Sequence, residues 1–207
     1  MGEQDTTARD WVLGFADEVL RREPELTELD QAAGDGDFGA NIAGACRLVR
    51  DEIGRLGADA PARQVLGAAA DVFLDEVGGT SGPLFGLLFQ AISRELGDRG
   101  LTPASLADGV AEGLAAIQRV GEAQPGDKTL VDALDPAARA LRGLDSGAGL
   151  GEAFRAAATA AREGAEATTD SRARRGRASY VGDHARGVPD PGAVTIGYLF
   201  AAGTPAN

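Results

Sequence analysis

The chain has almost no cysteine or histidine, few aromatic side chains and a shortage of positive charge. Its 207 residues contain one cysteine, Cys46, which excludes an intramolecular disulfide framework. The one histidine, His184, leaves no Ser-His-Asp or Cys-His set to assemble, so we expect it on the surface. With 20 basic and 32 acidic residues the net charge is −12, which argues against nucleic acid or an anionic membrane surface as the main partner.

Two further absences narrow the fold class. No run of about 18 apolar residues is present, and the N-terminus is polar and acidic, so we expect neither a membrane span nor a signal peptide but a soluble cytoplasmic protein. No run of alternating, β-branched residues is strong enough to predict a sheet. The sequence therefore predicts an all-α fold, with residues 1–207 in a single domain.

Alanine is abundant where aromatic residues are scarce, which indicates closely packed helices built on small residues. A first helix should begin after Thr7 as its N-cap and be interrupted by Pro24. Apolar spacing and caps predict seven more helices, over residues 39–55, 61–77, 84–96, 103–120, 130–141, 151–166 and 191–201.

Residues 29–41, LDQAAGDGDFGAN, carry three carboxylates within eight positions: Asp30, Asp35 and Asp37. Carboxylates this close repel one another unless a positive charge lies between them. The interleaved glycines allow the backbone to make a tight turn that points the carboxylates inward. We interpret this acidic loop as a site for hard cations; a solvated acidic turn is the alternative that the stretch alone leaves open.

Three familiar motifs fit this chain poorly. GDGDFG at 34–39 matches the dinucleotide fingerprint, but the segment before it is helical and two aspartates lie inside it. Residues 121–129, GEAQPGDKT, resemble a P-loop with one residue too many and no strand before it. Gly39 stands where an EF-hand loop needs a ligand.

Four loops marked by glycine or proline each lead into a helix N-terminus. They are the acidic loop, GGTSG at 78–82, PGDKT at 125–129 and the DPG sequence at 190–192. Free N–H groups and partial positive charge make helix N-termini suitable for phosphate. If consecutive helices are antiparallel, every second connection lies at the same end, so we expect these four loops to lie together.

The motifs in these loops, together with GRASYVGDHARGVPDPGA at 176–193, resemble those of the L subunit of dihydroxyacetone kinase, its nucleotide-binding component. The resemblance implies an antiparallel eight-helix barrel with the nucleotide at one end. It also implies that ATP or ADP binds through two Mg²⁺ ions held by Asp30, Asp35 and Asp37.

The resemblance carries further nucleotide contacts to matching positions of this chain. Two of these positions depart from the family pattern, because Phe38 and Ala40 stand where the family usually has histidine and threonine. The implied contacts are Phe38, Gly39, Ala40, Asn41, Thr80, Ser81, Gly121, Leu130, Arg177, Asp190, Pro191 and Gly192.

The family resemblance also implies a division of labour. The sugar is held covalently on a separate K-type subunit, and this chain would supply the phosphoryl group to dihydroxyacetone or a related small keto sugar. Phe38 and Ala40 motivate an alternative, a weakened nucleotide-sensing module that binds a regulatory partner. The sequence leaves two questions open: whether ATP is consumed or bound ADP is recharged by a phosphotransfer protein, and whether the chain forms a homodimer.

Overall fold

A computed structural model describes residues 7–75, 81–97, 99–175 and 186–205. Within these residues the regular structure is α-helical and no strand is present. The helices are α1 (Ala8–Ala33), α2 (Phe38–Arg55), α3 (Ala62–Asp75), α4 (Ser81–Leu96), α5 (Pro103–Gly121), α6 (Val131–Arg142), α7 (Leu150–Ala167) and α9 (Pro191–Ala201).

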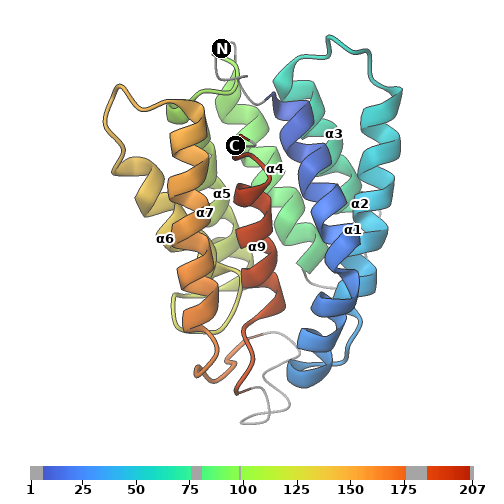
Figure 1. Ribbon diagram of the computed structural model, residues 1–207, viewed down its shortest axis with the longest axis vertical. Coiled ribbons are helices and arrows are strands. Elements are labelled where there is room, and N and C mark those ends of the chain that lie inside the picture. The colour runs from blue at the N-terminus through green and yellow to red at the C-terminus, as the bar shows by residue number, and fades with distance from the viewer. Residues whose placement is uncertain (1–6, 76–80, 98, 176–185, 206–207) are drawn as a thin grey trace.

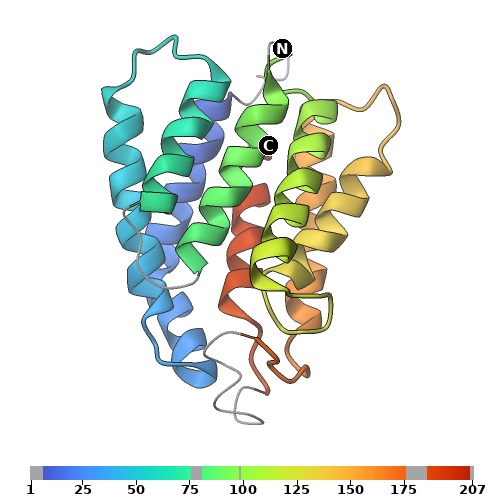
Figure 2. The ribbon, with the colours of Figure 1, turned by 180° about the vertical axis from the view of Figure 1, so that it is seen from behind.

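These helices form an antiparallel barrel (Figures 1 and 2). Each packs against the helix before it and the helix after it, and α9 closes the ring against α1. At this closure the indole N–H of Trp11 donates to the carbonyl of Leu199 at 2.7 Å, and the Trp11 ring packs on Phe154 of α7. The predicted eight-helix barrel is therefore confirmed for the described part of the chain.

Phenylalanines from three helices fill the barrel interior. Phe15, Phe73, Phe85 and Phe89 are buried, and their ring centroids lie 5.6–6.2 Å apart in the contacting pairs. Burying rings of this size supplies much of the hydrophobic stabilisation available to a chain with few aromatic residues. Cys46 is also buried, as a packing residue on α2.

Glycines allow α4 and α5 to approach each other closely. A Cβ at Gly109 would lie 2.6 Å from the Cα of Ile92, and one at Gly113 would lie 2.7 Å from Cδ1 of Leu88. These distances are shorter than the closest contacts that Cβ atoms make in proteins, so any larger residue would push the two helices or their side chains apart. The prediction of closely packed helices built on small residues is confirmed here.

The expected break at Pro24 is wrong, because α1 continues through this proline to Ala33. Proline in a helix removes one backbone hydrogen bond, here to the carbonyl of Leu20. The exposed Pro24 ring faces solvent, and ion pairs from Arg22 to Glu18 and Glu25 bridge the neighbouring turns. Packing of α1 on the barrel on both sides of the proline outweighs the lost bond.

The helices start within one residue of their predicted starts, except α4. Thr7 caps α1 and Thr102 caps α5 by accepting the backbone N–H groups of Asp10 and Ser105, both at 3.1 Å. α4 begins at Ser81, three residues before the predicted start, and Pro83 fits there because first-turn N–H groups need no helical acceptor. None of the described helices has the combination of length and hydropathy that a membrane span needs.

Candidate functional site

The three aspartates of the acidic loop converge on one spot. Asp30 lies in the last turn of α1, Asp35 in the connection, and Asp37 at the N-cap position of α2. One carboxylate oxygen from each lies within 4.8 Å of the other two. Asp30 is partly buried whereas Asp35 and Asp37 are exposed, so the cluster is open to solvent on one side.

Local backbone chemistry explains why this connection is so tight. Gly36 has φ +80°, a conformation that side chains with a Cβ rarely adopt. The N–H of Phe38 donates to Oδ2 of Asp30 at 2.9 Å, which ties the start of α2 to the end of α1. Gly39 then lets α2 lie against α1, because a Cβ there would be 2.7 Å from both the carbonyl of Glu23 and the N–H nitrogen of Thr27.

The donor set suits a hard divalent cation. Mg²⁺ prefers carboxylate oxygens and retains open coordination positions for water or phosphate. Three carboxylates around one point, two of them exposed, provide both. The same loop leads into the first turn of α2, where the helix dipole favours anions.

The residues that follow Asp37 differ in what they expose. The Phe38 side chain is 8% exposed and belongs to the hydrophobic core, and its N–H is committed to Asp30. Ala40 is exposed and Asn41 partly exposed on the first turn of α2. Phe38, which stands where the family usually has histidine, is therefore a core residue. Ala40, which stands where the family usually has threonine, leaves the exposed first turn of α2 without a hydroxyl at that position.

The remaining predicted contacts that the structure describes lie at four helix ends: the end of α5 and the starts of α4, α6 and α9. Ser81 is the first residue of α4 and Gly121 the last of α5, both partly exposed. Thr80, Arg177 and His184 lie outside the described residues. Figures 1 and 2 show α2, α6 and α9 beginning at the same end of the barrel, with α4 beginning toward it, as the alternation predicts.

Leu130 and Gly192 bring the N-termini of α6 and α9 together. A Cβ at Gly192 would lie 3.3 Å from Cβ of the buried Leu130, so the glycine permits this approach. Asp190 caps α9 by accepting the N–H of Ala193 at 2.7 Å. The DPG sequence and Leu130 thus form one continuous wall.

Asp190 also links this wall electrostatically to the acidic loop. Burial raises the pKa of its carboxyl to about 7, the hydrogen bond from Ala193 opposes this, and Asp132 and Asp30 raise it further, while Lys128 lowers it. Asp30 is close enough to influence Asp190, so the two loops share one electrostatic environment.

This raised pKa predicts a specific pH dependence. A carboxyl with a raised pKa in the folded state stabilises the fold when protonated, and that contribution is lost as the pH rises from about 4 through about 7. Without metal, the free energy of unfolding of Asp190→Asn should exceed that of the parent at pH 8. This gain should be larger than the gain at pH 5 by ~1–3 kcal/mol. Urea unfolding of both proteins in a chelator at the two pH values measures this difference. Asparagine can still cap α9, so the substitution tests the charge and not the cap. Equal pH dependence in both proteins would contradict the raised pKa of Asp190.

Three charged residues in and just after the loop before α6 were not identified as important from the sequence: Asp127, Lys128 and Asp132. Asp132 accepts the N–H groups of Gly126 and Thr129, at 2.5 and 2.8 Å, and Asp127 is 7% exposed. Lys128 is 2% exposed, and its ammonium donates to backbone carbonyls. The loop is therefore not a phosphate-binding P-loop, as its sequence context indicates, but a tightly bonded structural turn.

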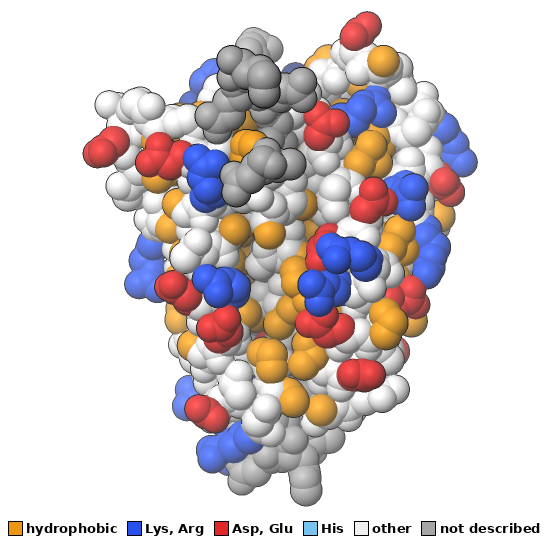
Figure 3. Space-filling view, viewed as in Figure 1, with side chains coloured by type: hydrophobic (Ala, Val, Ile, Leu, Met, Phe, Trp, Pro, Cys, Tyr) orange, Lys and Arg blue, Asp and Glu red, His pale blue; other side chains and the backbone are white. Residues whose placement is uncertain are grey.

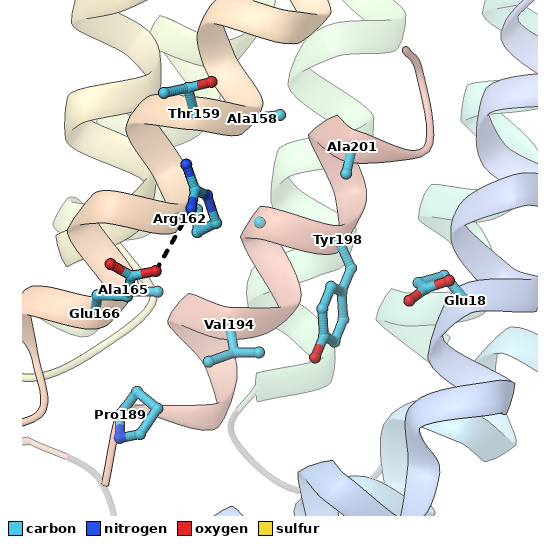
Figure 4. Close-up of a pocket in the computed structure, with 11 residues that line it drawn as sticks. Glu18, Ala158, Thr159, Arg162, Ala165, Glu166, Pro189, Val194, Tyr198 and Ala201 are labelled. Atoms are coloured by element: carbon cyan, nitrogen blue, oxygen red, sulfur yellow. Dashed lines mark ion pairs between the residues drawn. The ribbon is translucent and has the colours of Figure 1, made fainter. Parts of the chain in front are cut away.

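A separate pocket of about 480 Å³ lies on the flank of the barrel, along α9 between α7 and α1 (Figure 4). Its floor is apolar, with Val194, Ala158 and Ala201, and the Arg162–Glu166 ion pair lies at one side. Figure 3 shows the same face as an apolar strip bordered by acidic and basic side chains. This pocket includes none of the residues of the acidic loop.

The fold and the site together define a class of protein: an all-helical barrel with a carboxylate cluster of cation-binding type at the end where helix N-termini gather. The DAK2 domain family matches residues 32–204 of this chain. The chain is 41% identical over 186 residues to L-erythrulose 1-kinase of Mycolicibacterium smegmatis. This alignment covers 87% of this chain and 32% of that protein.

A match over nearly the full length of both chains is found with a subunit from Listeria innocua. This protein, PEP-dependent dihydroxyacetone kinase 1, ADP-binding subunit DhaL, is 33% identical over 193 residues, covering 93% of this chain and 91% of the subunit. The crystal structure of native dihydroxyacetone kinase of C. freundii superposes with a TM-score of 0.70 at 26% identity, covering 94% of this chain and 33% of that one. The chain belongs to the DAK2 domain family.

Proposed function

We propose that the chain is the nucleotide- and Mg²⁺-binding component of a kinase for small keto sugars. The observation that carries this proposal is the convergence of Asp30, Asp35 and Asp37 beside the N-terminus of α2, at the end of the barrel where α6 and α9 also begin. Residues 1–207 would act as one nucleotide-binding domain, working in the cytoplasm.

In this proposal two Mg²⁺ ions bind the three aspartates and neutralise the phosphates of ATP or ADP. The chain's own groups then position the nucleotide. First-turn N–H groups of α2 and α4 would face phosphate oxygens, with Ser81 and Asn41 as side-chain donors. Leu130 and Gly192 would provide an apolar wall for the base and ribose, with Gly121 at its edge. Phosphoryl transfer needs little covalent help from protein, so positioning and charge neutralisation suffice.

The relatives support a transfer to a small keto sugar held elsewhere. They are named as erythrulose and dihydroxyacetone kinases, and this chain spans 32% of the erythrulose kinase but 91% of the Listeria subunit. We therefore propose that a K-type subunit presents dihydroxyacetone or erythrulose to this chain. The name of the Listeria subunit supports ADP as a resident nucleotide, which a phosphotransfer protein would recharge.

The test is a reconstituted assay with the full chain, a K-type subunit, Mg²⁺ and dihydroxyacetone, supplied either with ATP or with a phosphotransfer system. We expect keto-sugar phosphate to form only when both subunits are present. Product formation by the K-type subunit alone, or none with either donor, would contradict the proposal.

Ala40 and Phe38 favour a second candidate, a nucleotide sensor that no longer turns over. Ala40→Thr adds a hydroxyl at the exposed first turn of α2, and one such bond contributes about 0.5–1.5 kcal/mol, so we expect a less than ~10-fold rate increase over an already active chain. Phe38→His is a poorer probe, because burying an unpaired imidazole in the core costs about 1–3 kcal/mol. A native chain without turnover, rescued by the double variant, would favour the sensor.

A further inference from the structure

Lys128 is the single lysine among 20 basic residues, the other 19 being arginines. It is also the most buried charged side chain of its loop, at 2% exposure, and its backbone has φ +60°. Among the described residues no carboxylate lies within ion-pair distance of its ammonium. A buried cation without a partnered anion is costly, so its surroundings must supply strong acceptors.

Those acceptors are backbone carbonyls from two distant parts of the chain. The Lys128 ammonium donates to the carbonyls of Thr168 and Val188, both at 2.7 Å, and to that of Thr169 at 3.4 Å. An ammonium has three donors in a tetrahedral arrangement, and all three are used. A planar guanidinium cannot reproduce this geometry, which gives a physical reason for lysine at a position in a chain that otherwise uses arginine.

The bonded carbonyls lie beside the start of α9. The hydroxyl of Thr168 accepts the N–H of Asp190 at 2.8 Å, and the N–H of Gly187 donates to the carbonyl of Thr169 at 2.9 Å. Lys128 adds its bond to Val188, two residues before Asp190. One ammonium therefore fixes the end of α7 against the segment that leads into the DPG sequence.

The loop that carries Lys128 is itself rigid. Asp132 in the first turn of α6 accepts from Gly126 and Thr129 on both sides of the lysine. Asp127 accepts the N–H of Gln124 at 2.9 Å. Because Leu130 follows two residues after Lys128, a fixed loop sets the distance between Leu130 and the α9 N-terminus.

We propose that Lys128 is a positioning residue of the nucleotide site: its buried ammonium holds the Asp190–Gly192 turn against Leu130. This inference rests on the proposed function, since these residues are the proposed wall for the base and ribose. The ammonium itself is enclosed by carbonyls, so it acts through the wall rather than by touching phosphate. The cationic charge also offsets the neighbouring carboxylates Asp190 and Asp132.

The test compares Lys128→Met with the parent chain by calorimetry with MgADP and by titration with Mn²⁺ alone. Methionine keeps an unbranched stem but has no donors. We expect MgADP to bind at least 10-fold more weakly while Mn²⁺ binding at the acidic loop stays within twofold. Arg142→Met is the matched control, because it removes one positive charge at the exposed far end of α6; its MgADP affinity should stay within twofold.

Two further measurements keep the proposal falsifiable if Lys128→Met does not fold. Thr168→Val removes the hydroxyl that accepts from Asp190 and should weaken MgADP at least threefold. The single lysine also allows ¹⁵N-lysine labelling, in which one side-chain ammonium signal should move on MgADP binding. Unchanged affinity in Thr168→Val or Lys128→Met, or an unmoved signal, would overturn the inference. A parent chain that does not bind MgADP would instead overturn the proposed function.

Discussion

Replacing Asp35 with asparagine should abolish Mg²⁺-dependent binding of ADP. The three carboxylates of the acidic loop lie within 4.8 Å of one another, and no cation binds such a cluster equally well after one charge is removed. Loss of a group that only orients a metal ligand costs about 10–100-fold in affinity, so loss of a ligand itself should cost at least ~100-fold. Calorimetry with ADP in Mg²⁺, and again in a chelator, measures the effect.

Asp59→Asn provides the matched control for this charge change. Asp59 is exposed in the connection between α2 and α3, whereas the acidic loop joins α1 to α2 at the other end of the antiparallel pair. Its substitution removes the same charge, and its ADP affinity should equal that of the parent. If Asp35→Asn bound ADP as the parent does, the assignment of the metal site to this loop would be wrong.

Gly39→Ala should produce the largest loss of stability among single small substitutions in α2. The added methyl would lie 2.7 Å from the backbone of α1 at Glu23 and Thr27, so the two helices must separate. Overpacking of this kind costs about 1–3 kcal/mol. Because Phe38 and Asp30 join the same two helices through a hydrogen bond, Mn²⁺ affinity at the acidic loop should fall as well.

Gly44→Ala in the same helix separates this effect from helix propensity. A Cβ at Gly44 would meet nothing within 4 Å, so the variant should be more stable than the parent by about 0.5–1 kcal/mol. Urea unfolding of both variants gives the two free energies. Equal shifts in the same direction would show that the contact between α1 and α2 does not depend on Gly39.

The barrel could be predicted from the sequence because each helix carries its own signals. Thr7 and Thr102 act as caps where the residue type indicates, and apolar spacing marks the inner faces. Pro24 misled the prediction because its local cost is smaller than the packing of the long helix around it. Such tertiary compensation is invisible in a window of a few residues.

The acidic loop could be predicted from its spacing, but the role of the loop before α6 could not. Three aspartates lie within eight residues, and the glycines between them allow the tight turn that brings the carboxylates together. Lys128 contacts residues 40 and 60 positions away, and no local pattern indicates such partners. The available signal was compositional: one lysine in a chain that otherwise uses arginine marks a position where the two cations are not interchangeable. The burial of Phe38 could not be predicted from its position beside the aspartates either, because it depends on the direction in which α2 leaves the loop.

Closure of the barrel by α9 has a consequence for synthesis of the protein. The bond between Trp11 and Leu199 joins residues 188 positions apart, so α1 can pack on α9 only after α9 has left the ribosome. Contacts of such long range are slow to form, and a nascent chain lacking α9 exposes the apolar edges of α1 and α7. The DPG turn arrives with α9. A nascent chain without α9 would therefore carry the acidic loop but lack the proposed wall for the base and ribose, so under the proposed function nucleotide capture would wait for α9.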